Sequence, residues 1–172
     1  MQIIPKDSRE CYQIDITDIP DKLQTDINSK YLLSIIDTFS KIEGNYVLAN
    51  KRADTVLGFV KDFISKNGKP KKFHSENGKE FRNKLFEDYC KKNEISFVHG
   101  RHHRQSRGTV ESYNKEIKRL LEVRYLENPK FVSIYKDLPD VINIYNENIH
   151  SSTKFKPNFC LNLKIKILKK RH

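Results

Sequence analysis

The spacing of apolar residues changes near residue 50, and this change restricts the fold more than any other feature of the sequence. In the segment 11–18, apolar residues alternate with polar ones, and two more short apolar segments, 31–37 and 44–49, follow it within hairpin distance. A period of two is typical of β-strands with one buried face. We therefore predict that the chain begins with a meander of three antiparallel strands.

Beyond residue 50, helical spacing alternates with short apolar segments. Two further strands are predicted at 72–74 and 95–98, each preceded by a helix. The apolar residues that define the four predicted helices are Val56, Leu57, Val60, Phe63 and Ile64; Leu85, Phe86, Tyr89 and Cys90; Val110, Tyr113, Ile117, Leu120 and Leu121; and Leu138, Val141, Ile142 and Tyr145. Three antiparallel strands followed by strand–helix alternation predict an α/β domain. Its mixed five-stranded sheet has helices on both faces, and this order resembles that of RNase H-like folds.

Residues that start or stop helices support these boundaries. Asn67-Gly68, followed by Pro70, ends the first helix, and Asn83 caps the second. Pro139 is expected in the first turn of the last helix, where a missing N–H is tolerated. The basic, glycine-containing segment 100–108 is predicted to be a loop before the third helix.

The chain has 172 residues, which suits one domain, and a net charge of +11. An excess of Lys and Arg favours a polyanionic partner such as nucleic acid, although a lysine-rich composition is the alternative explanation. Cys11, Cys90 and Cys160 are far apart and form no C-x-x-C pair, which is typical of reduced thiols rather than of a zinc site. The sequence contains no signal peptide and no membrane-spanning apolar segment, so we expect a soluble intracellular protein that does not bind membranes.

The first candidate functional residue is an acid in the middle of an apolar strand. Asp15 lies in Gln13-Ile14-Asp15-Ile16-Thr17, although Asp is unfavourable inside strands. Asp18 is a competing candidate, but its position beside Ile19-Pro20 is typical of a turn. A turn-facing or edge-strand acid is the alternative explanation for Asp15 taken alone.

The second candidate is Glu76, in His74-Ser75-Glu76-Asn77-Gly78. Asn-Gly is a turn signal, so Glu76 would lie at the carboxyl end of a strand, where open α/β sheets bind ligands. An ordinary loop acid is the alternative.

The third candidate is Glu111, at the start of the third predicted helix. Asn114, Lys115 and Lys118 follow at i+3, i+4 and i+7, so one helix face carries a carboxylate for a metal and cations for phosphate. A solvated helix surface would give the same pattern.

Together these segments resemble the integrase core domain of retroviruses, long-terminal-repeat retrotransposons and large DNA transposons. Five segments carry the resemblance in the family's order: Gln13-Ile14-Asp15-Ile16-Thr17; Ile36-Asp37-Thr38-Phe39-Ser40-Lys41; His74-Ser75-Glu76-Asn77-Gly78 with Phe81; the run from Gln105 to Lys115; and Tyr145-Asn146 with His150-Ser151-Ser152 and Lys156-Pro157. The resemblance implies a catalytic core over residues 11–160. Residues 1–10 would be an N-terminal extension, and residues 161–172 a basic tail.

The resemblance also implies an activity. The domain would join DNA 3′ ends to target DNA by phosphoryl transfer, using two Mg²⁺ or Mn²⁺ ions held by Asp15, Glu76 and Glu111, without any small-molecule cofactor. DNA would contact the third helix and the loop before it, at Asn114, Lys115, Lys118, His102, His103, Arg104 and Arg107. The resemblance further implies a homodimer or higher oligomer, and the nucleus as the place of action.

One residue departs from the family pattern. The family has Asp where this chain has Glu76, and the additional methylene moves the carboxylate outward by roughly one C–C bond. Two alternatives therefore stay open: a domesticated or weakened core that binds DNA or proteins without catalysis, and an RNase H-like nuclease.

Overall fold

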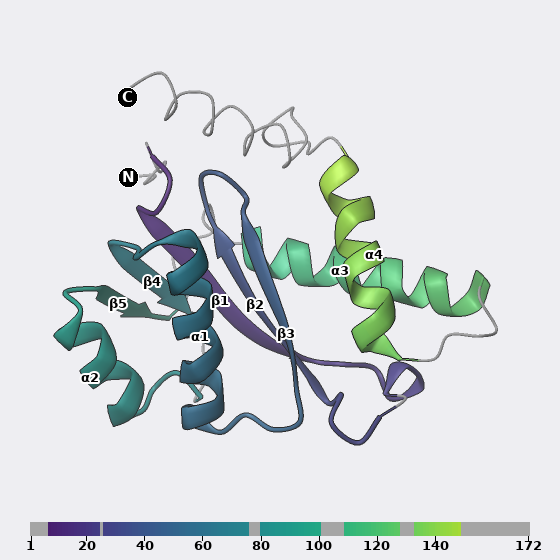
Figure 1. Ribbon diagram of the computed structural model, residues 1–172, viewed down its shortest axis with the longest axis horizontal. Coiled ribbons are helices and arrows are strands. Elements are labelled where there is room, and N and C mark those ends of the chain that lie inside the picture. Colours follow the sequence, from purple (N-terminus) through teal and green to yellow (C-terminus); the bar gives the residue numbers. More distant parts are fainter. Residues whose placement is uncertain (1–6, 25, 76–79, 101–108, 128–132, 149–172) are drawn as a thin grey trace.

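The computed structural model describes residues 7–24, 26–75, 80–100, 109–127 and 133–148 of the chain. Five strands, four α-helices and one short 3₁₀ helix are found in these ranges (Figure 1). In chain order they are β1 (Cys11–Asp18), η1 (Asp21–Leu23), β2 (Tyr31–Asp37), β3 (Glu43–Leu48), α1 (Ala53–Asn67), β4 (Lys72–Ser75), α2 (Lys84–Lys92), β5 (Ser96–His99), α3 (Thr109–Glu127) and α4 (Ile134–Glu147).

The strands form one mixed sheet in the order β3-β2-β1-β4-β5. β2 is antiparallel to both β1 and β3, whereas β4 runs parallel to β1 and β5 runs parallel to β4. This arrangement confirms the fold class predicted from the sequence.

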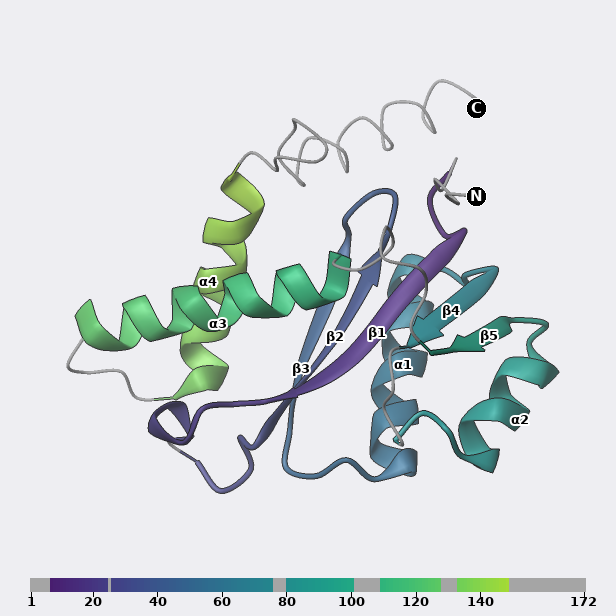
Figure 2. The same ribbon diagram turned by 180° about the vertical axis from the view of Figure 1, so that it is seen from behind.

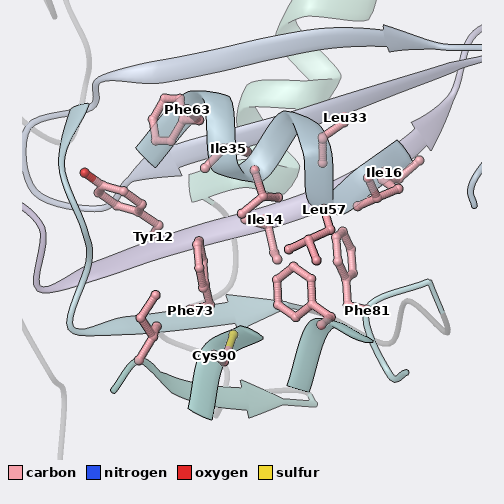
Figure 3. Packing of buried hydrophobic residues seen from close by; sticks show 14 of the residues in the cluster. Tyr12, Ile14, Ile16, Leu33, Ile35, Leu57, Phe63, Phe73, Phe81 and Cys90 are labelled. Carbon is pink, nitrogen blue, oxygen red and sulfur yellow. The ribbon is translucent and has the colours of Figure 1, made fainter. Parts of the chain in front are cut away.

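Helices cover both faces of the sheet, and each face has its own apolar core. Tyr12, Ile14 and Ile16 of β1 pack with α1 and α2 in one cluster, in which side chains from β1, α1 and β4 meet (Figure 3). Leu32 and Ile36 of β2 belong to a second cluster formed with α3 and α4. Figures 1 and 2 show α1 and α3 on opposite sides of the sheet. Because strand side chains alternate, β2 contributes to both cores, with Leu33 and Ile35 in the first cluster and Leu32 and Ile36 in the second.

Two of the predicted helix boundaries are confirmed in detail. α1 ends at Asn67, and Gly68 follows it with φ +92°, a conformation that is unfavourable for residues with a Cβ. The side chain of Asn83 caps α2 by accepting a hydrogen bond from the backbone N–H of Phe86 at 3.0 Å.

The predicted start of α4 is wrong. Pro139 is not in the first turn, because the helix begins at Ile134 and the Ser133 side chain caps it by accepting from the N–H of Tyr135 at 3.3 Å. A proline inside a helix costs about 3 kcal/mol. Burying an Ile side chain contributes about 1.5–3 kcal/mol and a Ser cap about 1 kcal/mol. Since Ile134 is fully buried one turn before Leu138, these gains offset the cost and extend the helix by one turn.

The structure also bears on the predictions about the cysteines and about membrane-spanning segments. Cys11 and Cys90 are both free thiols, whereas Cys160 lies outside the described residues. Among the helices in the described ranges, none is both long and apolar enough to cross a bilayer.

Two glycines give a matched test of the packing between sheet and helix. A Cβ on Gly44 of β3 would lie 2.3 Å from Cδ2 of the buried Phe63, whereas a Cβ on the exposed Gly58 of α1 would meet nothing within 4 Å. We expect Gly44→Ala to lower the free energy of unfolding by about 1–3 kcal/mol, because the Phe63 ring must move. Gly58→Ala should raise it by about 0.5–1 kcal/mol through helix propensity. Urea unfolding measures both, and equal effects would contradict the packing described for β3 and α1.

Candidate active site

Strand β1 presents polar side chains on the face that α3 covers. Tyr12, Ile14 and Ile16 point into the opposite core, so the alternating residues Gln13 and Asp15 face α3. Gln13 is buried and Asp15 is half-buried. The unusual acid of this strand therefore lies beneath a helix, on a central strand of the sheet, and the edge-strand explanation for it is excluded.

Two hydrogen bonds join these two residues to the start of α3. The Gln13 side-chain oxygen accepts from the backbone N–H of Val110 at 3.1 Å, and Asn114 Nδ2 donates to Asp15 Oδ2 at 2.9 Å. The spacings match, because two residues along a strand span about 6.6 Å and four residues along a helix span about 6 Å. The first turns of α3 therefore lie against the middle of β1 (Figure 2).

Glu111 lies between these two attachment points. It follows Val110 in the first turn of α3, and its side chain is exposed. The structure thus brings the element that carries the third predicted acid into direct contact with the strand that carries the first. Lys115 is exposed and Lys118 is half-buried further along the same helix.

Asn114 has a different environment from the one expected of a DNA contact. Its side chain is 3% exposed and is bound to the Asp15 carboxylate. This contact holds the carboxylate in one orientation, which is a positioning role. The Asn114 Oδ1 atom is buried and accepts no hydrogen bond from any described residue.

The oxygen atoms carried by β1 and by the first turns of α3 are of the type that binds hard divalent cations. Carboxylate oxygens at Asp15 and Glu111 and an unpaired amide oxygen at Asn114 are the donor type that Mg²⁺ and Mn²⁺ prefer. Within the described ranges, no three His, Cys, Asp or Glu side chains gather as a metal site. Glu76 lies outside the described residues.

The described part of β4 ends one residue before Glu76. Ile14 of β1 pairs with Ser75, and the Ser75 hydroxyl forms a hydrogen bond with Nδ1 of His99 on β5 at 3.1 Å. His74 Nε2 forms one with the carbonyl of Gly100 at 3.0 Å. These bonds fix the last described residues before position 76 and before the segment 101–108. The predicted DNA contacts His102, His103, Arg104 and Arg107 lie in that segment, outside the described residues.

Asp18, the competing acid, lies at the end of β1. It is exposed, and its carboxylate forms an ion pair with Lys51 at 3.4 Å. This surface pair explains Asp18 without a catalytic role.

Two residues in this part of the fold, Gln13 and Glu43, carry no sequence signal of their roles. Gln13 was assigned no role, although its position two residues before Asp15 places it on the same strand face. Glu43 was also missed: its carboxylate accepts from Asn146 Nδ2 at 2.6 Å, and burial raises its pKa. This bond fastens the Tyr145-Asn146 segment of α4 to β3.

Comparison with protein families decides the assignment. The model of the integrase core domain matches residues 5–105, which is more than half of the chain. The chain belongs to the integrase core domain family. The matched region includes Asp15 and Glu76 and ends before Glu111. A search of curated proteins returned no match.

Solved integrase structures share the fold over most of this integrase core. The catalytic core domain of HTLV-2 integrase in complex with magnesium, in a trimeric form, is 22% identical, with a TM-score of 0.67 over 87% of this chain and 93% of its own. The BIV integrase catalytic core is 19% identical, with a TM-score of 0.70 over 94% of this chain and 99% of its own. A chain of the simian T-cell lymphotropic virus intasome, solved with PP2A regulatory subunit B56 gamma, is 21% identical, with a TM-score of 0.73. That match covers 87% of this chain and 52% of the intasome chain.

The contact between Gln13 and α3 can be tested by stability. Gln13→Leu would leave the N–H of Val110 without its side-chain acceptor, and an unsatisfied buried donor costs about 1–3 kcal/mol. Thr17→Val is the matched control on the same strand face, because the buried Thr17 hydroxyl has no partner among the described residues. Urea unfolding should show a loss for Gln13→Leu and none for Thr17→Val. Equal stabilities would show that Gln13 does not hold α3.

Proposed function

We propose that this domain is the catalytic core of an integrase, which joins DNA 3′ ends to target DNA by phosphoryl transfer with two divalent metal ions. One observation carries the proposal. The Asp15 carboxylate is held by Asn114 beneath the turn of α3 that carries Glu111, so two acids distant in sequence come from touching elements. Family membership and the shared fold support the same conclusion.

The described part of β4 ends beside the proposed site. Gln13 pairs with His74 and Ile14 with Ser75, so Asp15 and Glu76 directly follow two paired residues. We propose that Glu76 is the second acidic ligand, as the resemblance of its segment to the family's pattern implies.

The roles of the residues follow from this arrangement. Bound Mg²⁺ or Mn²⁺ supplies Lewis acidity to the attacking and leaving oxygens of an in-line displacement. Asp15 would be a fixed ligand, because Asn114 holds it, and Glu111 would approach from the exposed side of α3. Lys115 and Lys118 would bind phosphates of the DNA ends, one and two turns after Glu111, and the segment with His102, His103, Arg104 and Arg107 would contact the same DNA. Asn114 would act on DNA only through Asp15, since it is buried.

The net charge of +11 supports DNA as the partner, because Lys and Arg release counterions when they bind phosphates. Target DNA would be the second substrate, and we propose action in the nucleus.

A weakened core that binds DNA without catalysis is the second candidate function. The observation that favours it is Glu76, because two-metal sites depend on ligand positions to within about 1 Å. The strand-transfer rates of the wild type and of Glu76→Asp separate the two candidates.

Asp15→Asn and Glu111→Gln should each abolish Mg²⁺-dependent nicking and strand transfer on a labelled duplex, with a loss of at least about a hundredfold. Asp18→Asn and Glu116→Gln are the matched controls, since they make the same changes on β1 and α3 at acids that form surface ion pairs. Both controls should keep activity within about twofold. Full activity in either active-site variant would refute the assignment.

Glu76→Asp tests whether the longer side chain limits the rate. If Glu76 is a displaced ligand, Glu76→Asp should raise the rate of Mg²⁺-dependent strand transfer, because Asp restores the family's side-chain length. A tenfold loss of rate would instead show that the site is built for glutamate. If neither wild type nor Glu76→Asp is active, the binding function remains.

We also propose that the domain self-associates. HTLV-2 integrase cores are known in dimeric and trimeric forms. Light scattering at high concentration should give a mass of at least twice 20.4 kDa, and a monodisperse particle of 20.4 kDa would contradict the proposal.

A further inference from the structure

A row of three polar residues crosses the sheet beside the proposed site. Asp15 of β1 pairs with Ser34 of β2, and Ser34 pairs with Asn45 of β3. Paired residues share a face, so all three lie under α3. Ser34 is 0% exposed and stands between Leu32 and Ile36, two residues of the apolar cluster on this face.

α3 contacts both ends of this row. Asn114 Nδ2 donates to Asp15 at one end, and at the other end Asn45 Nδ2 donates to the hydroxyl of Tyr113 at 2.5 Å. The Ser34 hydroxyl donates to Asn45 Oδ1 at 3.3 Å and links the middle of the row to its end on β3. The contacts come from consecutive residues of the helix, which lie about 100° apart around its axis.

We propose that Tyr113 and Asn45 are positioning residues that set the rotation of α3 and thereby aim Glu111 at the metal site. This proposal rests on the proposed function. The bonds at Val110 and Asn114 lie one turn apart on one side of α3 and leave the helix free to turn slightly about that line of contact. The bond at Tyr113, about 100° around the axis from Asn114 and two strands away, removes this freedom.

Even a small rotation of α3 would move the Glu111 carboxylate by a distance that matters for catalysis. A turn of about 20° moves a side-chain tip, roughly 6 Å from the helix axis, by about 2 Å. A misplacement of about 1 Å in a catalytic group can cost about a hundredfold in rate. Glu111 is exposed, and packing on the helix therefore constrains it less than a buried side chain.

Packing alone does not require the Tyr113 hydroxyl. The ring of Tyr113 is 1% exposed and meets the edge of Tyr145 at a centroid distance of 4.7 Å. A phenylalanine would make the same ring contact without burying a polar group, which is costly unless that group is bonded. Burial also raises the pKa of the Tyr113 phenol well above its usual value, so the hydroxyl stays neutral.

Tyr113→Phe removes this bond and keeps the ring. The matched control is Tyr12→Phe, because Tyr12 is equally buried and its hydroxyl donates to the carbonyl of Gly68 at 3.1 Å on the other face of the sheet. Three quantities are measured for each variant of the 172-residue chain: the Tm, Mn²⁺ affinity from the paramagnetic resonance of free Mn²⁺, and the rate of strand transfer.

We expect both variants to lose similar amounts of thermal stability. Only Tyr113→Phe should also weaken Mn²⁺ binding by about tenfold and slow strand transfer by at least tenfold, whereas Tyr12→Phe should stay within twofold of wild type in both. Equal Mn²⁺ affinities for the two variants would overturn the proposal and show that the Tyr113 bond only stabilises the fold.

Ser34→Ala provides a second test if Tyr113→Phe does not fold. It removes the hydroxyl that holds Asn45 and keeps the rest of the row, so a smaller loss of Mn²⁺ affinity is expected, and unchanged affinity would count against the proposal. The proposed function fails separately, if Asp15→Asn binds Mn²⁺ as well as wild type does.

Discussion

The attachment of α3 to β1 is the constraint on which the rest of the site depends. Gln13 caps the backbone at Val110, and Asp15 receives the amide of Asn114. Without these bonds the helix could pack its apolar residues on the sheet at many rotations, because hydrophobic contacts have little directional preference. The two polar residues of β1 restrict the helix to a narrow range of these rotations. Stability of the fold and placement of Glu111 therefore come from the same few atoms.

The arrangement of layers makes this attachment possible. β1 is the middle strand of the sheet, and its apolar residues all enter the core with α1 and α2. Its other face is thus available for polar side chains, and the apolar cluster of α3 and α4 draws on β2 instead. A central strand can carry an acid in this fold because only one of its two faces contributes apolar side chains to a core.

Periodicity and turn residues were sufficient to predict most of the fold. The strands, the end of α1 at Gly68 and the cap of α2 at Asn83 are local features that a sequence carries directly. The start of α4 could not be predicted in this way. The burial of Ile134 against other elements outweighs the local preference of Pro139 for a first turn. Local sequence alone does not show which residues tertiary packing will bury. For the site, the motifs predict the three candidate acids, Asp15, Glu76 and Glu111, but not the residues that position them. The contact between Asp15 and Asn114 depends on the rotation of α3, which local sequence does not determine. Periodicity correctly places Tyr113 in the core, but it does not show that the Tyr113 hydroxyl is bonded to Asn45.

The most direct test of the account is a crystal structure of the chain with Mn²⁺, using anomalous diffraction to locate the metal. The account predicts an anomalous peak within coordination distance of the carboxylates of Asp15 and Glu76, with Glu111 facing the same space and Asn114 still bonded to Asp15. A carboxylate of Glu76 directed to the opposite face of the sheet from Asp15, or metal bound only elsewhere on the surface, would contradict it.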